Sequence, residues 1–226
     1  MLIKDIFQGR RPYFLIIALG FLIYFQAMFF GFSYLDDNTL ILDNQYFLNN
    51  LSNIPEAFQT DVFHLFNHSA SYYRPILTIS LMLDYQLGKT APFIYHLINI
   101  ILHLLTSCLV FFFLQKLNYR KDLALFFSLI FVIHPVLTQA VAWIPGRNDS
   151  LLAIFVLSMF ILFIEYLQKN SKKYLIWFMI FFMLALFTKE SAIVCFPLIV
   201  FFLYFIKNKK ENTFSKIYVF GGLSTI

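Results

Sequence analysis

Charged residues are scarce in this sequence: Asp, Glu, Lys and Arg occupy only 13% of its 226 positions, whereas 60% are hydrophobic and the mean hydropathy is +0.74. A soluble domain of this length would carry more charge on its surface, so the composition excludes that class and indicates a membrane protein. The apolar runs are too continuous for the alternating pattern of a barrel strand. Because only helices and closed barrels satisfy every backbone group in lipid, the predicted fold class is all-α and polytopic.

Cysteine is equally scarce, with Cys108 and Cys195 far apart inside apolar runs. Their separation does not match the ligand spacing of a metal site, and we interpret both as packing residues. Tyr13–Phe32 is too long for the core of a signal peptide, and no small-residue cleavage site follows it. We therefore expect it to be an uncleaved first span.

The apolar runs predict six full spans and the start of a seventh at Ile217. The six are Tyr13–Phe32, Phe93–Leu114, Leu123–Ala142, Leu151–Leu167, Tyr174–Phe187 and Ser191–Ile206. Residues 33–92 are predicted to form a large first extracytoplasmic loop, which carries amphipathic helices on the membrane surface. Because the chain ends inside an apolar run, we interpret residues 1–226 as the N-terminal part of a transmembrane domain whose remainder is missing.

The basic residues predict the orientation. If the N-terminus is cytoplasmic, 13 of the 17 lysines and arginines lie on the inside, as the positive-inside rule requires. The four outside are Arg74, Lys89, Arg147 and Lys189. The net charge of +5 is therefore explained by topology, and we expect no nucleic-acid partner.

Two adjacent carboxylates, Asp36 and Asp37, follow the first span on the outer face. One interpretation is that they cap a loop helix with help from Asn38 and Thr39. However, a single carboxylate is enough for a cap, and a second one beside it adds repulsion. The alternative is that the pair carries the chemistry of the protein.

Cations lie at three other span ends on the same face: Arg74 in "YYRPI", Arg147 in "GRNDS" and Lys189 in "TKES". Charge close to the membrane interior is costly and indicates a functional site. The alternative for Lys189 is a self-neutralising ion pair with Glu190 at a tight hairpin.

The "GRNDS" stretch also has two interpretations. Gly146 permits a tight turn, and Asn148, Asp149 or Ser150 can cap the helix that follows. In that case the stretch is an ordinary capped loop. The free N–H groups of the helix start, together with Arg147, would alternatively make an anion site.

A polar stripe lies in the second predicted span at helical spacing, formed by His96, Asn99, His103 and Thr106. In lipid such a stripe should face the bundle interior. The two histidines are too far apart to bind one metal ion without further ligands, so hydrogen bonding between helices is favoured. His134–Pro135 predicts a kink in the third span, with the imidazole capping local carbonyls.

The outer face thus combines a carboxylate pair with several cations. This combination suits the transfer of a group from an anionic leaving group to a hydroxyl. The carboxylate would accept the proton of the acceptor hydroxyl, and Arg and Lys would stabilise the departing phosphate.

Five motifs carry a family resemblance: "YLDDNTLIL", "YYRPI", "PFIYHLINIILH", "HPVLTQAVAWIPGRNDSLLAIFVL" and "FTKESAIV". Together they resemble the transmembrane and tetratricopeptide-repeat-containing O-mannosyltransferases and their bacterial relatives. These are type C glycosyltransferases akin to the protein O-mannosyltransferases. The resemblance runs from about Tyr34 to Leu198.

The resemblance implies a membrane hexosyltransferase that inverts the sugar and uses a polyprenyl-phosphate or dolichyl-phosphate donor carrying a mannose-like sugar. It implies catalysis by Asp37 and Asp36 on the extracytoplasmic side; we place Asp37 first, although the sequence does not rank the two. The implied phosphate contacts are Arg147, Lys189 and Arg74, with Glu190 and Asp149 orienting them, and we add His96 and His134 as supporting residues. No cofactor is required, and a metal ion held by the acidic pair is the less favoured alternative.

The acceptor is expected to be a hydroxyl on protein, with a lipid or a glycan as the alternative. A transporter or flippase is the competing class, but it predicts broken spans in matched halves and charges near the bilayer midplane. Here the charges lie at outer helix ends, which favours the enzyme. We expect an integral protein of the bacterial inner membrane, with the endoplasmic reticulum as the alternative.

Overall fold

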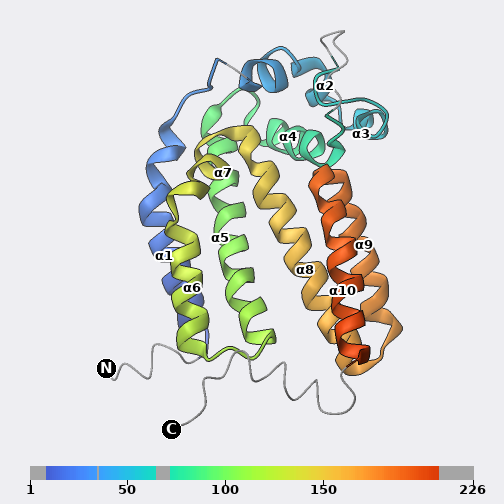
Figure 1. Cartoon of the computed structure of the whole chain (residues 1–226). Coiled ribbons are helices and arrows are strands. Elements are labelled where there is room, and N and C mark those ends of the chain that lie inside the picture. The colour runs from blue at the N-terminus through green and yellow to red at the C-terminus, as the bar shows by residue number, and fades with distance from the viewer. Residues whose placement is uncertain (1–8, 35, 65–71, 209–226) are drawn as a thin grey trace.

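The structure is a computed structural model of the chain and describes residues 9–34, 36–64 and 72–208 (Figure 1). Every regular element within these residues is a helix, which confirms the all-α prediction. The seventh run, which was predicted to begin at Ile217, lies outside the described residues.

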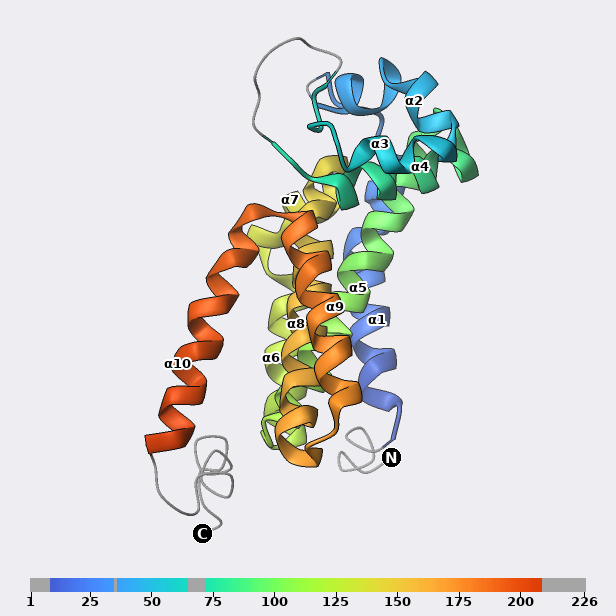
Figure 2. The same cartoon turned by 90° about the vertical axis from the view of Figure 1, so that its right-hand side faces the viewer.

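The long helices run side by side as a bundle (Figures 1 and 2). They are α1 (Arg11–Tyr24, continued by the 3-10 helix Phe25–Phe29), α5 (Pro92–Lys116), α6 (Lys121–Ile133), α8 (Arg147–Lys169), α9 (Lys172–Thr188) and α10 (Cys195–Asn208). Figure 2 shows α10 diverging from the other helices after the turn that follows α9. The short helices of the first loop cover one end of the bundle.

Within the described residues, three helices are long and apolar enough to cross a membrane: Arg11–Phe29, Pro92–Lys116 and Ile144–Lys169. A fourth span is possible if α6 and the segment Pro135–Ala142 are counted as one, although they meet at 51°. The helix α9 has 17 residues, fewer than the roughly 20 that span a bilayer without distortion. All six predicted runs are therefore helical, but a count of six spans stays a prediction.

The predicted kink at His134–Pro135 is confirmed as a break. The helix α6 ends at Ile133, and the chain continues as the 3-10 turn Pro135–Leu137 and the short helix α7 (Thr138–Ala142). Pro135 forces the preceding residue out of the helical region, and His134 is extended. The predicted capping of carbonyls is wrong, since His134 Nδ1 accepts a hydrogen bond from the backbone N–H of Val136 at 3.3 Å.

The polar stripe of α5 faces the bundle interior, as predicted: His96, Asn99, His103 and Thr106 are all at most 2% exposed. His103 Nε2 lies 3.0 Å from the carbonyl oxygen of Val132 at the end of α6. The Thr106 hydroxyl donates to the backbone carbonyl of Leu102 in its own helix. The stripe therefore ties α5 to neighbouring backbone inside an apolar bundle.

Asn99 has a particular role in this packing. Its amide nitrogen donates to three backbone carbonyls, those of Val141, Trp143 and Ile144, at 3.2, 3.0 and 3.2 Å. These carbonyls lie where the broken helix turns back toward α8, and those of Trp143 and Ile144 also accept the backbone N–H groups of Gly146 and Arg147. One side chain of α5 thus fixes the path of the segment between α7 and α8.

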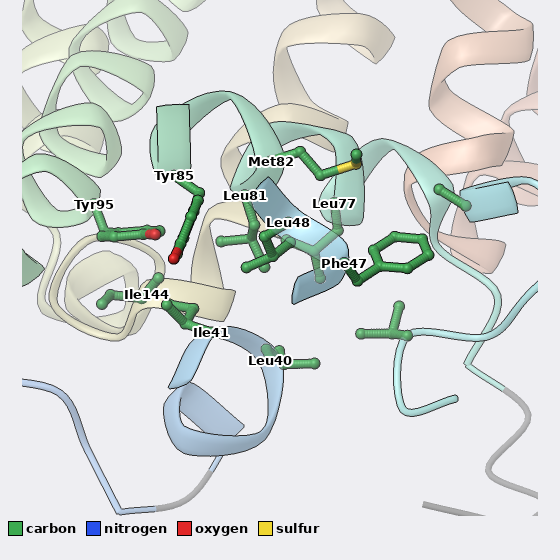
Figure 3. Close-up of a cluster of buried hydrophobic side chains, with 12 residues drawn as sticks. Leu40, Ile41, Phe47, Leu48, Leu77, Leu81, Met82, Tyr85, Tyr95 and Ile144 are labelled. Atoms are coloured by element: carbon green, nitrogen blue, oxygen red, sulfur yellow. The ribbon is translucent and has the colours of Figure 1, made fainter. Parts of the chain in front are cut away.

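The first loop folds into a layer with its own core (Figure 3). The layer contains α2 (Gln45–Asn49), α3 (Ile54–Ala57) and α4 (Pro75–Gly88). Apolar side chains of these helices and of the turn before them pack together, among them Leu40, Ile41, Leu48, Leu77, Leu81 and Met82. Tyr95 and Ile144 extend the same cluster into the bundle, so the layer is seated on the helix ends. Its position relative to the membrane stays a prediction.

Candidate functional site

The two adjacent aspartates lie in different environments. Asp37 is 1% exposed, and its Oδ2 accepts hydrogen bonds from the Ser33 backbone N–H at 2.7 Å and the Ser33 hydroxyl at 2.9 Å. Asp36 is only partly buried. The capping interpretation is wrong for Asp37, because this residue precedes the helical turn Asn38–Leu42 without forming a side-chain cap. The carboxylate instead folds back onto the end of the first span.

His96 holds this span end against α5. Its Nε2 lies 3.4 Å from the carbonyl oxygen of Gly31, and its ring meets that of Phe30 edge-on at 6.0 Å. The predicted supporting residue therefore contacts the segment that leads into Asp36 and Asp37, rather than the carboxylates themselves.

A cavity of about 410 Å³ lies between the loop layer and the bundle, and four predicted site residues line it. These are Asp36 from the first loop, Arg74 before α4, Asp149 at the start of α8 and Lys189 after α9. We call this space the charged cavity. Residues far apart in the sequence thus line one cavity. Their positions at separate span ends could not show that they lie together.

Each cation of the charged cavity has a carboxylate partner. Arg74 makes two hydrogen bonds to Glu190, from Nη2 to Oε1 at 2.9 Å and from Nε to Oε2 at 3.4 Å. Lys189 Nζ lies 2.5 Å from Asp149 Oδ1. Both pairs are partly open to solvent, with Glu190 and Asp149 more exposed than the cations. Glu190 and Asp149 thus lie where they can orient Arg74 and Lys189.

Arg147 is placed differently from the other two cations. It is fully buried, and its guanidinium forms an ion pair with Asp84 of α4 and donates to the Tyr95 carbonyl at 2.9 Å. It is not among the residues that line the charged cavity. Burial raises the pKa of Asp84, and the Arg147 charge opposes that shift. Arg147 therefore joins α4, α5 and α8 instead of reaching into the cavity.

The start of α8 forms one wall of the charged cavity. Its N-cap is Gly146 and no side-chain cap is formed, so the interpretation in which Asn148, Asp149 or Ser150 caps the helix is wrong. Glycine is required here because the backbone of Gln139 packs closely against it: a Cβ on Gly146 would lie 2.2 Å from the Gln139 carbonyl oxygen. The backbone conformation of the turn does not itself demand glycine. The free N–H groups of this helix end favour an anion.

A second, largely apolar cavity of about 370 Å³ is also lined by Trp143. Asp37 lines it together with Phe30, Phe32 and Gln139. We call this space the apolar cavity. Trp143 lines both cavities, so the adjacent aspartates face spaces of different character.

Sequence reasoning missed Asp84 and Trp143 here, and it wrongly placed His134 near the site. Asp84 could have been found as the one charged residue in the α4 segment. Trp143 lines the charged cavity, and so does Asn148, which the sequence analysis considered as a helix cap. His134 is exposed and lines neither cavity. Among the described residues, no group of three His, Cys, Asp or Glu side chains could hold a metal ion.

Comparison with known proteins agrees with the resemblance. A protein O-mannosyl-transferase of Caenorhabditis elegans is 30% identical over 84% of this chain and 28% of its own length. Human protein O-mannosyl-transferase TMTC3 is 31% identical over 72% of this chain and 18% of its own length. Mouse protein O-mannosyl-transferase TMTC2 is 33% identical over 66% of this chain and 18% of its own length.

The chain thus spans less than a third of the length of these relatives. No solved structure matches it. The sequence profile described as dolichyl-phosphate-mannose-protein mannosyltransferase matches residues 76–226, about two thirds of the chain. This chain therefore belongs to the dolichyl-phosphate-mannose-protein mannosyltransferase family.

Proposed function

We propose that this chain forms the donor-binding and catalytic part of a membrane glycosyltransferase. The reaction moves a mannose-like sugar from a polyprenyl-phosphate donor to a hydroxyl group on protein, with inversion. The observation that carries the proposal is the charged cavity, which brings together two carboxylates, two cations and a helix N-terminus within one space. The names of the relatives and of the family support mannose as the sugar and protein as the acceptor.

The donor phosphate binds at the cationic wall. Arg74 and Lys189 are held by carboxylates that are more exposed than they are. A phosphate can replace these partners because it offers the same kind of oxygen with more charge. The N-terminus of α8 adds backbone donors on the same wall. As the bond between the anomeric carbon and the phosphate oxygen breaks, the electron pair leaves with the phosphate, where these groups stabilise it.

Asp36 is the general base of the proposal. It lies in the same cavity as the cations, whereas Asp37 is buried with one oxygen bound to Ser33. Burial raises the pKa of Asp36, and the neighbouring charge of Asp37 raises it further. A raised pKa makes a carboxylate a stronger base at neutral pH. This assignment reverses the order in which the sequence analysis placed the two residues.

Arg147 acts in the proposal as a positioning residue. Its buried ion pair with Asp84 fixes α4, which Arg74 immediately precedes, against α8, which carries Asp149. In this proposal Arg147 positions α4 and α8, and it does not contact the donor phosphate as the sequence analysis predicted.

The central experiment measures sugar transfer from dolichyl-phosphate-mannose to a serine- and threonine-containing peptide, with the whole protein in membranes. Asp36→Asn should lower kcat by a factor of about 10²–10⁴, the usual contribution of a general base. Asp43→Asn is the matched control, because Asp43 is an exposed aspartate of the same loop that does not line the charged cavity. Full activity of Asp36→Asn would contradict the proposal.

The proposal also places the loop layer on the extracytoplasmic side. Tyr46 in this layer is 95% exposed, so a Tyr46→Cys variant offers a reporter. A maleimide that cannot cross the membrane should label this cysteine when added from outside to intact cells or from the lumen of sealed vesicles. Labelling from the cytoplasmic side alone would reverse the topology.

A further inference from the structure

Asn148 is a buried amide without a partner at the wall of the charged cavity. It lies in the first turn of α8 and is 3% exposed. Neither its Nδ2 nor its Oδ1 has a hydrogen-bond partner among the residues that the structure describes. Buried amides are normally hydrogen-bonded, because removal from water without a partner costs free energy. Asn148 lines the charged cavity, although both of its amide atoms are themselves covered, so a ligand in the cavity can become the missing partner once the side chain turns toward it.

Asn99 shows what a buried asparagine does when its role is structural. It is also fully buried, and although its Oδ1 lacks a partner as well, its amide nitrogen has three backbone carbonyls as acceptors. It lines neither cavity. Asn148 differs in both respects, which argues against a packing role.

The two free atoms of Asn148 indicate the chemistry of the ligand group. Nδ2 donates and Oδ1 accepts, so the amide matches a group that does both. A sugar hydroxyl donates and accepts, whereas an ionised phosphate oxygen only accepts. The phosphate already has Arg74, Lys189 and the start of α8 on the same cavity.

We propose that Asn148 binds hydroxyl groups of the transferred hexose and thereby sets the preference among sugar donors. This inference rests on the proposed function and deepens it, since it names the part of the donor that one residue recognises. Asp36 then acts on the acceptor hydroxyl, and the hexose lies between it and the phosphate-binding cations.

The test compares Asn148→Leu, which keeps the size of the side chain and removes both hydrogen-bonding atoms, with the unmodified protein. Dolichyl-phosphate-mannose and dolichyl-phosphate-glucose are the two donors. We expect kcat/KM for the preferred donor to fall roughly ten- to a hundredfold, and the preference between the donors to shrink by about tenfold, because discrimination depends on hydrogen bonds to hydroxyls. Inhibition by sugar-free dolichyl phosphate should change less than about twofold, since that probe lacks the hexose.

Two variants serve as controls. Lys189→Ala should show the opposite pattern, with weaker inhibition by dolichyl phosphate and an unchanged preference between sugars. Ser150→Ala alters another buried polar residue at the start of α8 that does not line the cavity, and it should leave both readouts unchanged. Asn148→Ser provides a second, polar variant, which should lose part of the preference even if the leucine variant accumulates poorly.

Three results would overturn the inference. An unchanged sugar preference in Asn148→Leu would show that the amide does not contact the hexose. A parallel loss of dolichyl phosphate inhibition would assign Asn148 to the phosphate. Failure of both Asn148 variants to accumulate, beside a normal Ser150→Ala, would make the residue structural. Each of these leaves the proposed function intact if Asp36→Asn is inactive, whereas an active Asp36→Asn contradicts the proposed function itself.

Discussion

Two kinds of ion pair lie at the same end of the molecule, and they differ chiefly in burial. The side chains of Arg147 and Asp84 are 0% and 5% exposed, whereas those of Arg74 and Glu190 are 20% and 64% exposed. Neither partner of the buried pair can leave without stranding a charge away from water. The partners of the open pair can separate at little cost, because water or a ligand replaces each.

This difference in burial distinguishes cations that have similar positions in the sequence. Arg147 and Lys189 both follow an apolar run and both precede another. Only Lys189 lines the charged cavity, so only it can exchange its carboxylate partner for a phosphate. The open pairs suit binding, and the buried pair suits assembly of the layer on the bundle.

The largest effect is expected from Arg147→Met. It leaves Asp84 buried without a partner, which typically costs about 3–5 kcal/mol. We expect a lower unfolding temperature in detergent and less protein in the membrane. The double variant Arg147→Met/Asp84→Leu should recover much of the stability, because it removes both charges. A single variant as stable as the unmodified protein would erase the distinction between the two kinds of pair.

Lys189→Ala should act on binding rather than on stability. Loss of a charged hydrogen bond to the donor phosphate costs about 1.5–3 kcal/mol, so kcat/KM for dolichyl-phosphate-mannose should fall roughly ten- to a hundredfold. The unfolding temperature should stay close to that of the unmodified protein. Lys89→Ala is the matched control, since Lys89 bonds to Asn49 in the loop layer and does not line the cavity. Equal losses in both variants would argue for a general charge effect.

Asp37→Asn should shift the pH dependence of kcat/KM. Activity requires ionised Asp36 and is lost as the pH falls through its pKa, which burial and then the charge of Asp37 raise. Removing that charge lowers the pKa of Asp36, so the acid limb of the kcat/KM profile should shift to lower pH. Asparagine still offers an oxygen to Ser33, which preserves the local fold. A shift to higher pH, or complete loss of activity at every pH, would favour Asp37 as the base.

The smallest effect is expected from Glu190→Gln, which opens the exposed pair. Exposed ion pairs contribute about 0–1 kcal/mol, so stability should change by less than that amount. The donor KM should stay the same or fall by up to about threefold, because Arg74 no longer has a competing partner, and added salt should reduce the difference. Destabilisation as large as that of Arg147→Met would show that the pair is structural.

Much of the helical fold could be predicted from local sequence. The polar residues of α5 recur at helical spacing and therefore share one buried face. Pro135 lies in the interior of an apolar run, where a proline interrupts the helix. Asp36 and Asp37 were predicted as a pair because they are adjacent and follow an apolar run.

The pairings could not be predicted, because they depend on how distant segments meet. Arg147 and Asp84 are 63 positions apart, and nothing in either local sequence selects the other. Which aspartate faces the charged cavity depends on the turn Asn38–Leu42 and on the bond back to Ser33. Asn148 looked like a cap because the helix was expected to begin later than Gly146.

The three carbonyls bound by Asn99 have a consequence for how such a protein can change over generations. They fix the backbone that carries Trp143 and leads into Asn148, while Asn99 itself lines neither cavity. Substitutions at Trp143 or Asn148 can therefore alter what the cavities accept without moving the chain that holds them. The buried Asn99 amide thus separates the residue that holds this backbone in place from the residues that line the cavities.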